Sequence, residues 1–411
     1  MKYVIIVGDG MADYPIDSLG GKTPLTAAKT PNMDWLASHG ELGLVKTIPD
    51  GIAPGSEAAN LSILGYDPAR YFTGRGPIEA ASLGVQLKAD DVAFRFNLVT
   101  LMSRDSSVVM EDYAAGHITD AEAREIVLDL DKQMGTKEFE FYPGVSYRHL
   151  MVWRGGAVRC PGLEKLELTP PHDIIGKGIA PYLPGKGGTS DGNGTGQLIT
   201  LMEQSQRLLE NHPVNVAREK KGVLPGNAIW FWGQGRSPRM TTLKERFGME
   251  GYVISGVHLI KGIGALAGLT VLDVPGATGY FDTNYAGKTS YALEALRTKD
   301  FVYVHVEAPD EAGHMGDAVV KVGCIEAFDE KIVGPLLKGM QSFESYRVML
   351  LPDHATPIRL RTHSSDPVPF VIYRGGEKKP GSGANRFDEV SARQTGIFVE
   401  TGHELIERFL A

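Results

Sequence analysis

The sequence predicts an α/β fold, with a mainly parallel sheet that carries helices on both faces and is interrupted by an inserted α+β domain. Short β-rich runs near both ends of the chain stop at polar loops, which is typical of buried parallel strands. A helix signal follows the first run, and the middle of the chain has a different pattern. At roughly 150 residues per domain, a chain of 411 residues is expected to form two or three domains.

The outer parts of the chain supply the predicted sheet. Tyr3–Val7 reads as a strand that stops at the sequence GDG, so Asp9 stands at its carboxyl end. Pro31 at a first helical position and Gly40 after the last one predict a helix over Pro31–His39. Two later runs, Phe301–Val306 and Arg347–Leu351, are also predicted strands, and each breaks into a polar loop.

The middle of the chain predicts the inserted domain. Thr119 and Glu122 have the spacing of a capping box, which predicts a helix to about Met134. Alternating strand patterns follow over residues 138–153, and a second helix is expected from about Gln197 to Asn211. We therefore assign residues 1–86 and 240–411 to a catalytic α/β domain and residues 87–239 to the insert.

Composition excludes several classes of protein. The formal charge of −8 and the lack of a long Lys/Arg run give no basis for binding a nucleic-acid backbone. Two cysteines without a CxxC pair indicate neither a disulfide framework nor a thiolate zinc site. No stretch reaches the roughly 18 apolar residues that a membrane span needs, and Asp9 interrupts the first apolar run too early for a secretory signal. We expect a cytoplasmic protein without a membrane partner.

Six potential metal ligands lie at or just after the predicted strand ends, where open α/β sheets gather their binding sites. They are Asp9, Asp310, His314, Asp353, His354 and His363. Any one of them alone could be a turn cap or a packed histidine. All six residues in this order along the chain are harder to explain as independent turn caps and packed histidines. Carboxylate oxygen and imidazole nitrogen suit Mn²⁺, Zn²⁺ or Mg²⁺, and six ligands are too many for one catalytic ion, so we expect two divalent ions.

Ser56 stands where a Pro-Gly loop ends and an Ala/Leu-rich helix begins. One interpretation is that its hydroxyl simply caps the helix. The other is that Ser56 is a nucleophile, because a helix start offers backbone N–H groups and a field that favours an anion or a phosphoserine. Coordination to a metal ion would activate the hydroxyl further.

A set of motifs resembles the archaeal-type cofactor-independent phosphoglycerate mutases of the alkaline phosphatase superfamily: GDG at 8–10, PGSEAANLSILGYDP at 54–68, GRGPIEA at 74–80, APDEAGH at 308–314, PDH at 352–354 and THS at 362–364. The resemblance runs nearly end to end and implies an alkaline-phosphatase-like core. It implies that Asp310, His314 and His363 bind one metal ion. It also implies that Asp9, Asp353 and His354 bind the other together with Ser56, which takes the phosphoryl group. The C/S-x-P-x-R context of sulfatases is absent around Ser56.

The substrate that the resemblance implies is a small phosphorylated acid. Three carboxylates against two divalent ions leave a charge of about +1, so a phosphoglycerate needs further basic partners. By analogy with the family's substrate clamp, the candidates are Arg75, His117, Arg236 and Lys261. Each of them could instead be an ordinary solvated surface group.

The implied reaction interconverts 3-phosphoglycerate and 2-phosphoglycerate through a phosphoserine, without 2,3-bisphosphoglycerate. The insert is expected to act as a lid that excludes water. One segment departs from the family: Glu111–His117 is acidic where an arginine-bearing segment is expected. Three alternatives therefore stay open: a homoserine kinase-like phosphotransferase, a metal-dependent phosphatase, and a metal-binding protein without catalysis.

Overall fold

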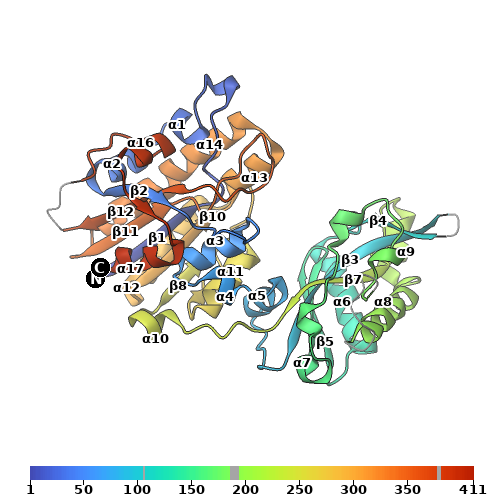
Figure 1. Ribbon diagram of the computed structural model, residues 1–411. Helices are drawn as coiled ribbons and strands as arrows, with labels where there is room; N and C mark the ends of the chain where they lie inside the picture. The colour runs from blue at the N-terminus through green and yellow to red at the C-terminus, as the bar shows by residue number, and fades with distance from the viewer. Residues whose placement is uncertain (105–106, 186–193, 377–380) are drawn as a thin grey trace. The chain divides into compact units, whose positions relative to one another are not determined.

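The computed structural model describes residues 1–104, 107–185, 194–376 and 381–411. These residues divide into two compact units (Figure 1). Unit 1 consists of residues 1–72 and 239–411, and unit 2 consists of residues 73–238. Unit 2 therefore begins earlier than the predicted insert at residue 87, because helix α5 (Arg75–Ser82) packs on the strands of unit 2. Gly76 of this helix lies so close to Ala93 that a Cβ would fall 2.5 Å from the Ala93 carbonyl oxygen.

Unit 1 is built on one sheet of eight strands. From edge to edge these are β13 (Phe398–Val399), β2 (Glu41–Val45), β12 (Val368–Gly375), β11 (Tyr346–Leu351), β1 (Lys2–Gly8), β10 (Phe301–Val306), β8 (Gly251–Ile254) and β9 (Thr270–Val271). The strands from β11 to β9 are parallel to one another, whereas β12 is antiparallel to both of its neighbours. This arrangement confirms the predicted mainly parallel α/β core, including the three predicted strands.

Helices cover both faces of this sheet because side chains alternate along each strand. On β1, Val4 and Ile6 join the large core cluster with α2 (Pro31–His39), α12 (Tyr285–Thr298), α14 (Ala318–Phe328) and α15 (Gly334–Met340). On the other face, Tyr3 contacts Phe409 of α17 (Leu405–Leu410) edge to face, and Tyr303 reaches α3 (Ser56–Ile63). The remaining α-helices described in unit 1 are α1 (Pro24–Ala27), α4 (Pro68–Tyr71), α10 (Leu243–Phe247), α11 (His258–Leu266), α13 (Ala308–Met315) and α16 (Glu389–Gln394).

Unit 2 is an antiparallel sheet with helices packed on it. Its strands are β3 (Val92–Arg104), β4 (Ser107–Asp112), β5 (Phe139–Val145), β6 (Arg148–Trp153) and β7 (Ala228–Gly235), and its helices are α5, α6 (Asp120–Met134), α7 (Gly156–Arg159), α8 (Thr195–Leu209) and α9 (Pro213–Lys220). The capping box predicted for α6 is present, with Thr119 and Glu122 bonding each other's backbone N–H. The two ends of unit 2 lie together, because Thr73 Oγ1 donates a hydrogen bond of 2.6 Å to the Arg236 carbonyl oxygen.

One local prediction is wrong and bears on the site. The segment after β10 was predicted to be a polar loop, but it forms helix α13. Pro309 stands in its first turn, where the missing N–H leaves no helical bond unmade. The helix places Asp310 and His314 four residues apart on one face.

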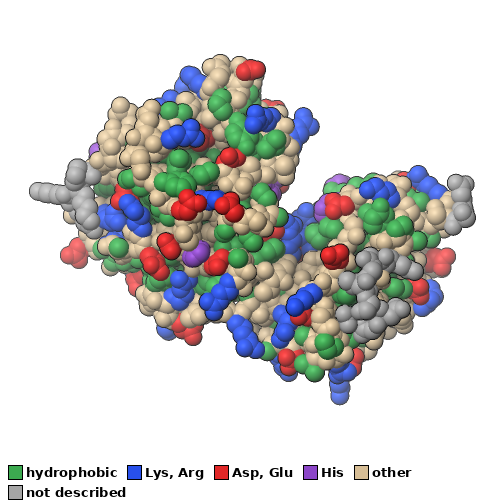
Figure 2. Space-filling view, viewed as in Figure 1, with side chains coloured by type: hydrophobic (Ala, Val, Ile, Leu, Met, Phe, Trp, Pro, Cys, Tyr) green, Lys and Arg blue, Asp and Glu red, His purple; other side chains and the backbone are tan. Residues whose placement is uncertain are grey.

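The surface carries charges of both signs. In the face drawn in Figure 2, Lys and Arg side chains are interspersed with Asp and Glu side chains. Within the described ranges, none of the helices combines the length and the apolar character that crossing a membrane requires.

Candidate two-metal and serine site

The register of the sheet brings the predicted ligands to one edge. Val7 of β1 lies opposite His305 of β10 and Leu351 of β11. Because these strands are parallel, the residues that follow them emerge at the same carboxyl edge, which is where Asp9, Asp310 and Asp353 stand. The three carboxylates are buried, with exposed fractions of 0–3%.

Ser56 lies among the residues that follow β1 and β11. Its Oγ is 3.0 Å from His354 Nε2, and the same nitrogen is 3.3 Å from Asp9 Oδ1 and 3.5 Å from Asp353 Oδ2. Ser56 is the first residue of α3, and the N-cap position before it is held by Gly55, which has no side chain to cap the helix. The helix-cap interpretation of Ser56 is therefore wrong, and the hydroxyl is directed to the His354 ring instead.

The other three predicted ligands form a neighbouring group. His314 Nε2 is 3.1 Å from Asp310 Oδ2 and 3.1 Å from His363 Nε2, and His363 Nε2 is 3.6 Å from Asp310 Oδ1. The rings of His363 and His354 are 4.3 Å apart, so the two groups are continuous. The structure thus brings all six predicted ligands and Ser56 into one cluster.

The cluster does not divide cleanly into the two predicted ligand sets. Donor atoms within 4.8 Å of one another occur in Asp310, His354 and His363, and again in Asp9, His305 and Asp353. His354 therefore stands between the sets, and His305 joins the second set. The sequence analysis missed His305 because it lies inside an apolar strand, where the pattern of FVYVHV indicates only a buried core position.

His305 is fully buried and has a partner on each ring nitrogen. Its Nε2 is 2.9 Å from Asp9 Oδ2, and its Nδ1 is 3.2 Å from Ser255 Oγ. Burial lowers the pKa of His305 to about 3. The ring is therefore neutral at ordinary pH and carries one proton on one of its two nitrogens.

Charge is crowded in the cluster. Burial, together with the carboxylates of Asp353, Glu307 and Asp310, raises the pKa of Asp9 well above its ordinary value. Burial also acts to raise the pKa of Asp310, but hydrogen bonds from His314 and His363 outweigh it and hold that pKa well below its ordinary value. Several carboxylates buried this closely repel one another unless cations neutralise them.

The residues present fit divalent metal ions. Asp9 Oδ1 is buried and, although His354 Nε2 lies 3.3 Å away, accepts no hydrogen bond from the described residues. Carboxylate oxygen and imidazole nitrogen are donors that Mn²⁺, Zn²⁺ and Mg²⁺ accept. Ions bound here would give the orphaned oxygen a partner and would offset the repulsion between the carboxylates.

The predicted basic residues are divided between the two units. Lys261 of α11 belongs to unit 1, and its Nζ is 2.6 Å from Asp273 Oδ1. Arg75, His117 and Arg236 belong to unit 2. Arg236 donates two hydrogen bonds to the Ala89 carbonyl oxygen, which occupies part of its guanidinium. His117 is exposed, and its backbone has a φ of 52°.

Unit 2 holds a basic cluster that the sequence analysis found only in part. Arg75 and Arg95 lie over the Trp232 ring, at 5.9 Å and 4.5 Å from its centroid. Burial lowers the pKa of Arg95 to about 10, and the positive charges of Arg148 and Arg75 act in the same direction against Glu79. His172 also packs on Trp232. The sequence analysis missed Arg95, which lies inside strand β3 among buried apolar residues.

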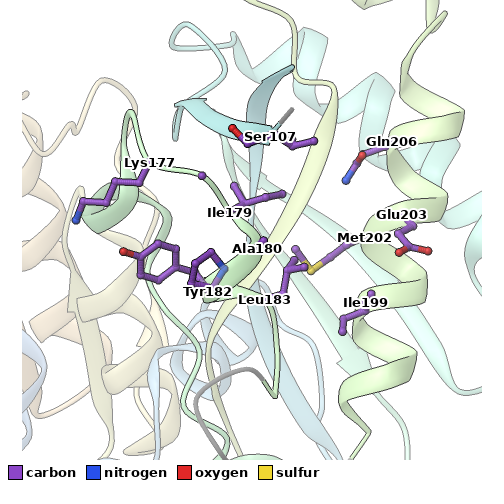
Figure 3. Close-up of a pocket in the computed structure, with 13 residues that line it drawn as sticks. Ser107, Lys177, Ile179, Ala180, Tyr182, Leu183, Ile199, Met202, Glu203 and Gln206 are labelled. Atoms are coloured by element: carbon purple, nitrogen blue, oxygen red, sulfur yellow. The ribbon is translucent and has the colours of Figure 1, made fainter. Parts of the chain in front are cut away.

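A separate cavity of about 630 Å³ lies in unit 2. Figure 3 shows residues of helix α8, including Met202 and Gln206, facing the segment that carries Lys177 and Tyr182. Its wall contains none of the predicted site residues. The candidate site is therefore defined by the Asp/His/Ser cluster rather than by this cavity.

A family model matches part of the chain. The model for 2,3-bisphosphoglycerate-independent phosphoglycerate mutase matches residues 37–215. A probable 2,3-bisphosphoglycerate-independent phosphoglycerate mutase of Geobacter sulfurreducens is 52% identical over 410 residues, covering 100% of both chains. The 2,3-bisphosphoglycerate-independent phosphoglycerate mutase of Methanosarcina barkeri is 51% identical over 407 residues, covering 99% of this chain and 98% of that one.

Two solved structures are similar over the whole chain. The PH0037 protein of Pyrococcus horikoshii has a TM-score of 0.82 at 30% identity, covering 100% of this chain and 96% of the other. The cofactor-independent phosphoglycerate mutase of Thermoplasma acidophilum has a TM-score of 0.68 at 28% identity, covering 100% of this chain and 99% of the other. Both the core and the interrupting unit therefore have counterparts in solved structures.

Proposed function

Because the chain belongs to the 2,3-bisphosphoglycerate-independent phosphoglycerate mutase family, it is an isomerase that interconverts 3-phosphoglycerate and 2-phosphoglycerate, and we propose that Ser56 carries the phosphoryl group. The observation that supports this role is the position of the Ser56 hydroxyl. It stands in the first turn of α3, one residue after the N-cap Gly55, and lies 3.0 Å from His354 in the carboxylate cluster. A serine needed only to start the helix would use its hydroxyl for the cap.

The proposed cofactors are two divalent metal ions, Mn²⁺, Zn²⁺ or Mg²⁺. Asp310, His314 and His363 would hold one of them. Asp9, Asp353 and His354 would hold the other, together with the Ser56 hydroxyl. When bound, such ions supply positive charge that favours the serine alkoxide and the phosphate oxygens. His305 contacts Asp9 rather than Ser56, so we assign it to holding that carboxylate in place.

The proposed transfer is balanced between two hydroxyls of glycerate. Ser56 Oγ forms a bond to phosphorus while the ester bond to the 3-hydroxyl breaks, and the proton lost from Ser56 matches the proton gained by the released hydroxyl. The glycerate then turns, and its 2-hydroxyl takes the phosphoryl group back as the bond from phosphorus to Ser56 Oγ breaks, while the proton lost by the 2-hydroxyl matches the proton regained by Ser56. Because the phosphoserine stores the group between the two steps, 2,3-bisphosphoglycerate is not needed.

The proposed contacts to substrate are basic. Lys261 in unit 1 and Arg75, Arg236 and His117 in unit 2 remain the candidates from the sequence. To them we add Arg95, because it is buried on Trp232, feels the positive charges of Arg75 and Arg148, and forms an ion pair with Glu79. A substrate carboxylate or phosphate would relieve the repulsion in this cluster. Unit 2 is proposed to exclude water from the phosphoserine, which would otherwise be hydrolysed.

A single assay separates this function from its alternatives. The protein is incubated with Mn²⁺ and 3-phosphoglycerate, and phosphorus resonances are followed without ATP and without bisphosphoglycerate. We expect 2-phosphoglycerate with little free phosphate. Release of phosphate alone would identify a phosphatase, and phosphohomoserine formed only with ATP and homoserine would identify a kinase.

Ser56→Ala is expected to abolish this conversion while folding and metal content stay nearly unchanged. The matched control is Ser62→Ala, since Ser62 is buried on the same helix and its hydroxyl has no hydrogen-bond partner within the described structure. Ser62→Ala should retain activity. Substantial turnover by Ser56→Ala would rule out the phosphoserine route.

A further inference from the structure

Asn60 stands one helical turn after Ser56 on α3 and is fully buried. Its amide nitrogen donates one hydrogen bond of 2.8 Å to Asp353 Oδ2 and another of 2.8 Å to the Ser56 carbonyl oxygen. Its amide oxygen accepts a hydrogen bond from the Tyr303 hydroxyl. Both N–H groups and the oxygen are therefore engaged, and this network fixes which end of the amide faces Asp353.

Asp353 is held on both of its oxygens. Oδ1 accepts hydrogen bonds from the backbone N–H of Gly10, at 3.1 Å, and of His354, at 2.9 Å. Asn60 is the side-chain donor to Oδ2. The two backbone N–H groups hold Oδ1 of the carboxylate. Of the three donors, only Asn60 contacts Oδ2 and so restrains rotation of the carboxylate about Oδ1.

Tyr303 determines the orientation of Asn60. The phenol lies on β10, is fully buried, and at ordinary pH can donate its proton to the amide oxygen. If the amide turned over, its NH₂ group would face the phenol and its oxygen would face the Asp353 carboxylate. That arrangement would place two acceptors against each other, which is unfavourable in a buried site.

We propose that Asn60 is a positioning residue that joins Asp353 to the first turn of α3, so that Ser56 and this carboxylate keep a fixed separation. The proposal rests on the proposed roles of Ser56 and Asp353. The polar atoms of Asn60 are engaged by Asp353, the Ser56 carbonyl oxygen and Tyr303, so its effect on the reaction passes through Asp353 and Ser56. A merely structural asparagine would stabilise the helix without affecting metal binding.

Asn60→Ala is the first test, and Asn215→Ala is its matched control. Asn215 is also a buried helical asparagine with three hydrogen bonds, but all three go to the backbone within unit 2. Mn²⁺ binding is measured by calorimetry on metal-free protein without substrate. We expect Asn60→Ala to weaken Mn²⁺ binding by about 10–100-fold and Asn215→Ala to leave it unchanged. Equal Mn²⁺ affinities in Asn60→Ala and the parent protein, or an equal loss in both variants, would overturn the proposal.

Tyr303→Phe is the second test and keeps the proposal falsifiable if Asn60→Ala does not fold. The change retains the ring and removes only the hydroxyl that orients the amide. We expect a smaller loss of Mn²⁺ affinity, together with a lower kcat at unchanged KM. Unchanged Mn²⁺ binding and kcat in this variant would contradict the role of the amide orientation. Mn²⁺ binding is measured without turnover. A negative mutase assay, which would refute the proposed function, can therefore be told apart from unchanged Mn²⁺ binding, which would refute the role of Asn60.

Discussion

Replacing Lys321 with methionine is expected to destabilise the protein by about 3–5 kcal/mol, because it leaves a buried carboxylate without its cation. Lys321 of α14 is 0% exposed. Its Nζ lies 2.8 Å from Asp13 Oδ2, 2.9 Å from the Thr356 carbonyl oxygen and 3.2 Å from the Ala12 carbonyl oxygen. The ammonium group therefore ties the loop after β1 to the loop after β11, and these loops carry Asp9 and Asp353.

The size of the effect follows from what remains around Asp13. Backbone N–H groups of Tyr14 and Ile358 still donate to its carboxylate, but its charge is no longer paired. Domains are stable by about 5–15 kcal/mol, so the loss is a large share of the total. Asp13→Asn added to Lys321→Met makes the pair neutral, and we expect most of the loss to be recovered.

The assay is urea unfolding of the metal-free protein, with the slope compared between variants to test that the unfolding transition is the same. Lys288→Met is the matched control. Lys288 is also 0% exposed, but its Nζ donates to the His305 carbonyl oxygen, and burial lowers its pKa to about 8. Its replacement should therefore be far less damaging. A loss below about 1 kcal/mol in Lys321→Met, or no recovery in the double variant, would refute the reasoning.

Two further outcomes are expected. Gly10 has a φ of 61°, and a Cβ there would lie 2.5 Å from Asp310 Oδ1 and 2.8 Å from Asp310 Cα. Gly10→Ala should therefore cost about 1–2 kcal/mol in backbone strain and lower the affinity for Mn²⁺. Unchanged Mn²⁺ affinity in calorimetry would contradict this expectation. Burial raises the pKa of Glu389 from 4.5 to about 7, so the folded state binds this proton more tightly, and the stability it supports falls as pH rises between these values. Glu389→Gln should match the parent near pH 4.5 and exceed it at pH 8 in urea midpoints, and the reverse order would refute the assignment.

The ligand positions could be predicted because they follow from strand ends. Asp9 and Asp353 come directly after apolar runs, and parallel strands bring such positions to one edge. Ser56 could be placed at the start of a helix, but whether its hydroxyl caps the helix or faces His354 depends on a residue almost 300 positions away. That choice is a matter of tertiary packing, which local pattern does not contain.

The residues that were missed share one property, which is that their partners are distant in sequence. His305 and Arg95 lie inside strands whose apolar neighbours indicate only a core. Asn60 lies in a helix, where its bonds to Asp353 and Tyr303 have no local signature. Unit 2 begins at residue 73 rather than at the predicted residue 87, because α5 packs on the strands of unit 2. The composition of the sequence before residue 87 does not indicate this packing.

The closed ends of unit 2 have a consequence for how the enzyme is made and how it can change. Thr73 and Arg236 are joined by a hydrogen bond, so the first and last residues of unit 2 lie close together. During synthesis the whole of unit 2 is made before β10 and β11. Strand β1, which precedes Asp9, can pair with its two neighbours in the sheet only after both of those strands have been made. Unit 2 can therefore fold early as a separate module, before Asp9 is brought beside the residues that follow β10 and β11. Exchange of that module between relatives would leave the order of the core strands intact.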